Sequence, residues 1–142
     1  MFFGSYQHNL DAKGRLLLPS RFRNEAGNTL YIMKGFDGAL SIFKESDFQK
    51  LVNSIENHPF NKKDSRDYIR VQLASVRLLE VDALGRILIP KEILNKYQLG
   101  KEVIVIGVGD HMEIWDKQVY EEYEKVTSAS FEQIAENIEK ED

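Results

Sequence analysis

The sequence contains no cysteine. Disulfide bonds and thiolate chemistry are therefore excluded, and the composition is compatible with a reducing compartment. The N-terminal stretch MFFGSYQHNL lacks the basic start and long apolar run of a signal peptide. No segment reaches the ~18 apolar residues of a membrane-spanning helix. We therefore expect a cytoplasmic protein that does not contact a membrane.

Signatures of enzymes and metal sites are also scarce. The three histidines are far apart, and none stands in HxxxH or HExxH spacing. Asp110, His111 and Glu113 could ligate a metal ion, but a run of this kind is more often an ordinary polar turn. No serine stands in the setting of a nucleophile elbow. We therefore predict a protein that is not an enzyme and that uses neither a cofactor nor a metal.

The net charge of −4 does not favour binding to nucleic acid. The charge is unevenly distributed, however. Through Arg77 the basic residues exceed the acidic ones by four, whereas from Leu78 onward the acidic residues exceed the basic ones by eight. This asymmetry is typical of a basic binding face joined to an acidic remainder, and it is equally expected where the acids only solvate the C-terminal helices.

What the sequence does contain is an internal repeat. Residues 10–19 read LDAKGRLLLP, and residues 81–90, which lie 71 positions later, read VDALGRILIP. After a slip of one position the similarity continues, with residues 35–51 over residues 107–123. Each copy has about 50 residues, a size that is marginal for independent folding. We therefore expect two copies of one structural unit that pack against each other.

Each copy is predicted to contain a strand, a tight turn, a short apolar strand and a short helix, followed by two strands and an amphipathic helix. In DAKG and DALG, Asp at the first position and Gly at the fourth favour a type I turn followed by a left-handed glycine, which would form a local hairpin with a bulge. Ser46 and Asp116 are the expected caps of the two amphipathic helices. The sequence thus predicts an α+β fold, with a first repeat at 5–47, a helix and linker at 48–75, a second repeat at 76–119 and a helical tail at 120–142.

The two DxxxR pairs are the main candidates for function. Asp11 and Asp82 can cap their turns through the side chain, and an Asp–Arg pair that only stabilises a turn is a common arrangement. The turn itself requires Asp and Gly (Gly14 and Gly85), but it does not require arginine. An arginine in both copies, Arg15 and Arg86, suggests a planar donor fork for carboxylate, phosphate or guanine.

The first copy adds further cations around its turn. Lys13, Arg21 and Arg23 accompany Arg15 in copy one, which fits phosphate binding as well as a solvated helix face. The matching positions of the second copy do not repeat this pattern. They are Leu84, Glu92 and Leu94.

These residues give the chain a resemblance to a known family. From MFFGSYQHNLDAKGRLLLPSRFR through VDALGRILIP to GDHMEIWD, the whole chain resembles the MraZ family of bacterial regulators, within the AbrB-like superfamily. The resemblance implies two tandem swapped-hairpin β units in a pseudo-symmetric small barrel, flanked by amphipathic helices. It also implies a ring-like homo-oligomer that binds double-stranded DNA at direct repeats in promoters of the division and cell-wall gene cluster, including its own.

Carried over by position, the resemblance assigns roles to individual residues and a place in the cell. The protein is expected to act at the nucleoid. The DNA-facing residues would be Lys13, Arg15, Arg21, Arg23 and Arg86, while Asp11, Gly14, Asp82 and Gly85 would shape the turns and orient the arginines. Leu84 stands where copy one has a lysine, and the second copy is therefore not expected to contribute equally.

Three other interpretations remain. An antitoxin-type DNA binder of the same superfamily usually has one hairpin copy and a toxin-binding tail, which two fused copies argue against. In an oligomeric structural or interaction protein, the DxxxR pairs would serve only to stabilise turns. A scaffold associated with a methyltransferase is the third.

Overall fold

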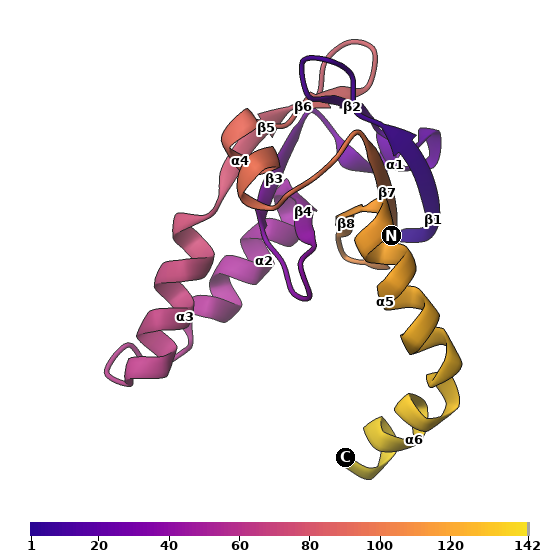
Figure 1. Cartoon of the computed structure of the whole chain (residues 1–142). Helices are drawn as coiled ribbons and strands as arrows, with labels where there is room; N and C mark the ends of the chain where they lie inside the picture. The colour runs from indigo at the N-terminus through magenta and orange to yellow at the C-terminus, as the bar shows by residue number, and fades with distance from the viewer. Residues whose placement is uncertain (142) are drawn as a thin grey trace.

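The computed structural model describes residues 1–141, and within them the chain forms a mixed α+β fold, as predicted (Figure 1). Asp142, the last residue of the expected tail, lies outside the described residues. The strands are β1 (Phe2–Asn9), β2 (Arg15–Leu17), β3 (Thr29–Lys34), β4 (Leu40–Lys44), β5 (Arg77–Glu80), β6 (Arg86–Leu88), β7 (Glu102–Gly109) and β8 (Met112–Asp116). The helices are α1 (Ser20–Ala26), α2 (Glu45–Glu56), α3 (Lys63–Ala74), α4 (Lys91–Lys96), α5 (Lys117–Ala129) and α6 (Phe131–Glu141).

The order of elements recurs along the chain. The series β1–β2–α1–β3–β4–α2 is followed, after α3, by β5–β6–α4–β7–β8–α5. The short helices α1 and α4 both begin directly after a proline, Pro19 or Pro90, whose fixed φ suits the start of a helix. α3 and α6 have no counterpart in the series.

Six strands form one antiparallel sheet, in the order β1-β7-β8-β4-β3-β5. The first strand of each series pairs with the third strand of the other, β1 with β7 and β5 with β3. The order begins at β1 and ends at β5, and within residues 1–141 these two edge strands do not pair with each other. The expected closed barrel is therefore wrong, because β2 and β6 leave the sheet and pair with each other as a separate two-stranded ribbon.

The ribbon also corrects the predicted local hairpins. β2 does not pair with β1, and β6 does not pair with β5; the two strands pair with each other instead. The reason is burial. Leu16, Leu18, Ile87 and Ile89 are fully buried in the core that lies under the ribbon, and burying one such side chain contributes roughly 1.5–3 kcal/mol. A hairpin at the edge of the sheet would leave them in water.

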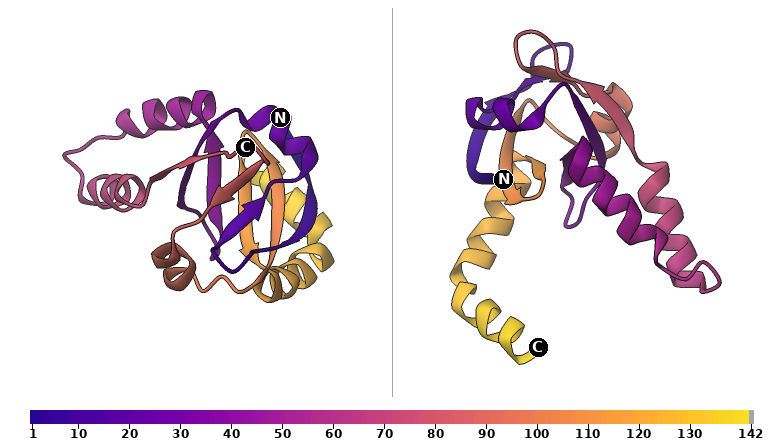
Figure 2. Two further views of the ribbon diagram at one scale, coloured as in Figure 1. Left: turned by 90° about the horizontal axis from the view of Figure 1, so that it is seen from above. Right: turned by 180° about the vertical axis from the view of Figure 1, so that it is seen from behind.

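Two helical projections leave the sheet. Figure 2 shows α2 and α3 lying side by side as one projection, while α5 and α6 form the other. Asp116 caps α5 as predicted, since its side chain accepts a hydrogen bond from the Val119 N–H. Ser46 does not cap α2, because β4 runs straight into the helix and Lys44 occupies the capping position. Within the described residues, no helix is both long and apolar enough to cross a bilayer.

Candidate nucleic-acid interface

The first DxxxR turn is held together by the Asp11 carboxylate. Its Oδ1 accepts hydrogen bonds from the backbone N–H groups of Lys13 at 2.9 Å and Arg15 at 2.8 Å. Its Oδ2 accepts the Nε–H of Arg15 at 2.6 Å. The Gly14 N–H donates to the Asp11 carbonyl oxygen at 3.0 Å, and Gly14 has a φ of 85°, a conformation that L side chains rarely adopt. The turn therefore fixes both the backbone and the guanidinium of Arg15.

The second turn repeats this arrangement. Asp82 Oδ1 accepts the backbone N–H groups of Leu84 at 3.0 Å and Arg86 at 2.8 Å, and Oδ2 accepts Arg86 Nε–H at 2.8 Å. Gly85 has a φ of 82°. The same hydrogen-bond pattern thus positions an arginine in each half of the chain.

Both carboxylates are stabilised in their charged form. The backbone N–H of Arg15 lowers the pKa of Asp11, and that of Arg86 lowers the pKa of Asp82; the arginine side chains act in the same direction. Each arginine side chain is about one-third exposed, at 32% for Arg15 and 29% for Arg86. The arginines are therefore oriented at the surface and are not buried in the fold.

The ribbon brings the two turns together. Leu18 N–H donates to the Gly85 carbonyl oxygen, and Ile89 N–H donates to that of Gly14, both at 3.0 Å. In the antiparallel register Arg15 lies opposite Leu88, and Leu17 lies opposite Arg86. Figure 1 shows the ribbon and both turns at the end of the molecule opposite the helical projections. The sequence prediction joined both arginines in one DNA-facing set, and the structure places them on one ribbon.

The sequence analysis missed the two exposed leucines of this ribbon, Leu17 and Leu88. The sequence predicts a short apolar strand after each turn, LLL or ILI, yet Leu17 and Leu88 are exposed. The available signal was the two-residue period of a strand that starts at an arginine. Since Arg15 points outward, Leu17 should point outward as well.

The remaining candidate cations occupy different surroundings. Lys13 is exposed in the first turn, and Arg21 on α1 is exposed with its guanidinium carbon 5.6 Å from the centre of the Phe3 ring. Arg23 is half-buried, and its Nε–H donates to the Leu18 carbonyl oxygen at 2.8 Å. Arg23 thus packs beside the second turn at one end of the ribbon, while Lys13 lies in the first turn. Contact of these residues with DNA stays a prediction.

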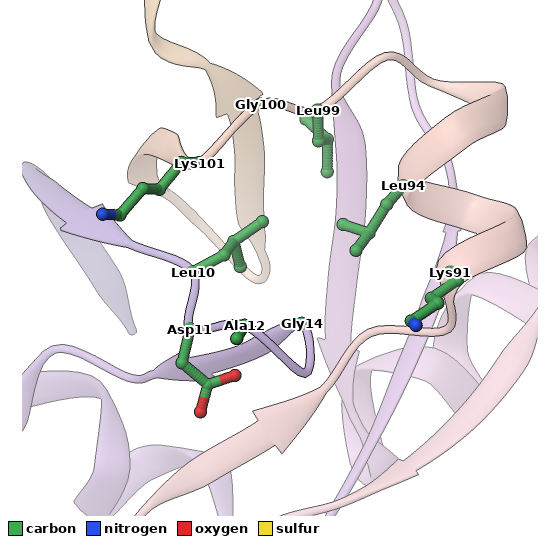
Figure 3. Close-up of a pocket in the computed structure, with 9 residues that line it drawn as sticks. All are labelled: Leu10, Asp11, Ala12, Gly14, Lys91, Leu94, Leu99, Gly100 and Lys101. Carbon is green, nitrogen blue, oxygen red and sulfur yellow. The ribbon is translucent and has the colours of Figure 1, made fainter.

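A cavity of about 430 Å³ adjoins the first turn (Figure 3). In Figure 3, Lys91 and Lys101 stand on opposite sides of it. Gly14 faces Leu94 here, whereas in the second half the longer Arg23 side chain lies against Gly85. The lining residues are Leu10, Asp11, Ala12, Gly14, Lys91, Leu94, Leu99, Gly100 and Lys101.

The run that could have ligated a metal is engaged in other contacts. His111 Nδ1 lies 2.7 Å from an Asp110 carboxylate oxygen, and its ring stacks on Phe43 with centroids 4.5 Å apart. Glu113 accepts a hydrogen bond from the Trp115 indole at 3.1 Å. Glu113 and His111 therefore have separate local partners.

Comparison with known proteins places the chain in a family. A family model described as "MraZ protein, putative antitoxin-like" matches residues 1–71 and again residues 74–141. A "Transcriptional regulator MraZ" from Caldanaerobacter subterraneus subsp. tengcongensis is 41% identical over 138 residues, which cover 97% of this chain and 96% of the relative. The chain is also similar to two further proteins of the same description. The protein from Desulforamulus reducens is 38% identical over 97% of each chain, and the protein from Mesoplasma florum is 41% identical over 97% of this chain and 95% of the relative. The chain therefore belongs to the MraZ family.

Proposed function

We propose that the protein is a sequence-specific DNA-binding transcriptional regulator. The observation that carries this proposal is the pair of arginines on one exposed ribbon, each held by a carboxylate. Arginine presents a planar fork that suits guanine edges and phosphates, and a fixed orientation reduces the entropy that is lost on binding. The relatives named as transcriptional regulators support the same conclusion.

The proposed interface consists of the ribbon, its two turns and the start of α1. Asp11, Gly14, Asp82 and Gly85 shape the turns and orient the arginines. The proposed targets are direct-repeat boxes in promoters of the division and cell-wall genes, including the promoter of the protein's own gene. The protein would then act at the nucleoid, by covering a promoter. The proposed DNA contacts are Lys13, Arg15, Arg21, Arg23 and Arg86.

We also propose that the unit is an AbrB-like pair of swapped hairpins, with repeats at 5–47 and 76–119, a linker helix region at 48–75 and a tail at 120–142. The exchange of first strands between the two halves supports this interpretation. Two small turns can contact only a few base pairs. A ring of subunits would add their weak contacts on repeated boxes, with gains of roughly 10²–10⁴ in avidity.

The exposed apolar side chains of the two helical projections support self-association. Such residues are scattered singly on most monomers, but here they recur along α3, α5 and α6. They are Tyr68, Val71, Leu73, Val119, Tyr123, Val126, Phe131, Ile134 and Ile138.

A gel shift on the DNA upstream of the protein's own gene tests the proposal. The wild-type chain should shift this DNA, and Arg15→Ala and Arg86→Ala should weaken the shift without an early thermal melt. Lys50→Ala is the matched control, because it removes an exposed cation from α2, away from the ribbon. Absence of any shift, or equal loss in the control, would contradict the proposal.

A structural or interaction protein is the second candidate. The favouring observation is that each aspartate also accepts two backbone N–H groups and thus stabilises its own turn. In that case Arg15→Ala would lower the melting temperature or dissociate the oligomer, and the protein would not select a DNA sequence.

A further inference from the structure

We propose that Leu17 and Leu88 are specificity-determining residues that contact thymine methyl groups next to the guanines bound by the arginines. The inference rests on the proposed function and deepens it. On the outward face of the ribbon stand only four side chains within β2 and β6. They are Arg15, Leu17, Arg86 and Leu88.

Burial separates the two faces of the ribbon. Leu16 and Ile87 are 0% exposed, whereas Leu17 is 38% and Leu88 is 54% exposed. Side chains of a strand alternate between its faces, so the exposed leucines lie on the same face as the arginines. The residues that flank them in sequence are buried in the core, whereas Leu17 and Leu88 are not part of it. An apolar side chain between two surface arginines therefore requires another explanation.

The register makes each Arg–Leu unit a composite of the two halves. Arg15 lies opposite Leu88, and Arg86 lies opposite Leu17. Residues directly opposite in an antiparallel pair have Cβ atoms about 4.5–5.5 Å apart. Each arginine therefore has a leucine from the other half beside it, and the two units are related by the pairing symmetry of the ribbon.

The guanidinium groups keep hydrogen-bond donors that a base could use. Each ion pair uses Nε, and in residues 1–141 the terminal amino groups of Arg15 and Arg86 donate no hydrogen bond. Two amino groups that the carboxylate does not engage suit the O6 and N7 acceptors of guanine. The adjacent leucine can then contact only the base edge next to that guanine.

Thymine is the partner that matches an apolar side chain in the major groove. A two-stranded ribbon fits this groove, which is about 12 Å wide. Among the four bases, only thymine presents a methyl group there, beside a single acceptor. The four outward side chains therefore predict two composite contacts, each reading one guanine and one neighbouring thymine.

Replacement of thymine by deoxyuridine tests this inference, because it removes only the methyl group. Duplexes are first enriched from a random pool with the wild-type protein. Binding of wild type, Leu17→Ala and Leu88→Ala is then measured on the enriched duplex and on its deoxyuridine form. Leu78→Ala is the matched control: Leu78 is 56% exposed, and because its neighbour Leu79 packs in the core under the ribbon, Leu78 faces the other side of β5.

The wild type should bind the deoxyuridine duplex about fourfold to fifteenfold more weakly, as expected for one or two lost methyl contacts. Each leucine variant should lose affinity for the thymine duplex and respond less to the methyl group, while Leu78→Ala should behave like wild type. If both leucine variants lost as much affinity as the wild type on the deoxyuridine duplex, the inference would be overturned. The same holds if the wild type bound both duplexes equally tightly. Either result would leave the proposed function standing. If no sequence is enriched, the proposed function itself fails.

Discussion

Arg23 lies across Gly85, although the two residues belong to opposite halves of the chain. A Cβ added at Gly85 would stand 2.5 Å from Arg23 Cδ, closer than real Cβ contacts allow. The Nε of the same arginine donates to the Leu18 carbonyl oxygen at 2.8 Å, which holds the side chain in place. The helix of the first half thus supports the turn that carries Arg86. The equivalent contact in the other direction is between Leu94 and Gly14.

Gly85→Ala should therefore lower the free energy of unfolding by more than backbone strain alone. A left-handed conformation costs a residue with a Cβ about 1–2 kcal/mol, and the added methyl group must also displace Arg23. Denaturant unfolding measures the loss. Gly38→Ala is the control, because Gly38 has a φ of 89° and no atom within 4 Å of its Cβ position. Equal losses of unfolding free energy in the two variants would show that the Arg23 side chain can move aside without destabilising the fold.

The turn chemistry could be predicted from the sequence, because it is local. The Asp11 carboxylate contacts only residues two and four positions away, so Asp, Gly and Arg at fixed spacing are sufficient to specify the turn. The same holds for Asp116, which caps the helix that begins at the next residue.

The pairing of the strands could not be predicted in the same way. A three-residue strand such as β2 carries no information about its partner, and the alternative partners β1 and β6 differ only in tertiary context. The pairing of β2 with β6 also brings Gly85 of the other half against the half-buried Arg23. This contact joins residues that are distant in sequence.

Asp11→Asn should separate the orienting role of the carboxylate from its role in the turn. The asparagine oxygen can still accept the two backbone N–H groups, but its amide would face Arg15 Nε with a second donor. We expect a nearly unchanged melting temperature and an affinity for DNA that is about tenfold lower. Asp11→Ala, which also loses the turn hydrogen bonds, should melt earlier. Wild-type affinity in Asp11→Asn would mean that the pair does not position Arg15 for binding.

Glu25 should make stability depend on pH in the acid range. Hydrogen bonds from Lys44 Nζ at 2.8 Å and from the amino group of Met1 at 2.6 Å lower its pKa from 4.5 to about 2. A depressed carboxyl pKa stabilises the fold above the unfolded pKa, and this contribution is lost as the pH falls toward the folded value. Glu25→Gln should therefore melt earlier than wild type at pH 7.

The difference in melting temperature should shrink as the pH falls from 4.5 to about 2. Glu122→Gln on α5 controls for the change in net charge. If the difference in melting temperature between Glu25→Gln and wild type stayed constant down to about pH 2, the ion pair with Lys44 would not be the cause of that difference.

Self-association should depend on the apolar residues of the C-terminal helices. Phe131 is 70% and Ile138 is 58% exposed in the single chain, and both lie on α6. Light scattering at micromolar concentration should detect an oligomer, and Phe131→Ser with Ile138→Ser should reduce its mass. A wild-type protein that is only monomeric would contradict the proposed ring.

The salt dependence of binding should distinguish the two halves of the interface. Copy one carries Lys13, Arg21 and Arg23, whereas copy two has no cation at these positions. Each phosphate contact that is lost removes about 0.9 from the slope of log affinity against log salt. Replacement of all three by glutamine should therefore flatten the slope, and Arg86→Ala should change it by at most about one unit per engaged subunit.

Arg23 needs a separate control in this experiment, because it also donates to the Leu18 carbonyl oxygen. Arg23→Gln alone should melt earlier, while the double variant of Lys13 and Arg21 should melt like wild type, since both residues are exposed. A flatter slope in the double variant would assign the phosphate contacts to the turn and to the exposed face of α1. An unchanged slope in both the double and the triple variant would mean that copy one does not face the phosphates, and the proposed orientation of the ribbon on DNA would be wrong.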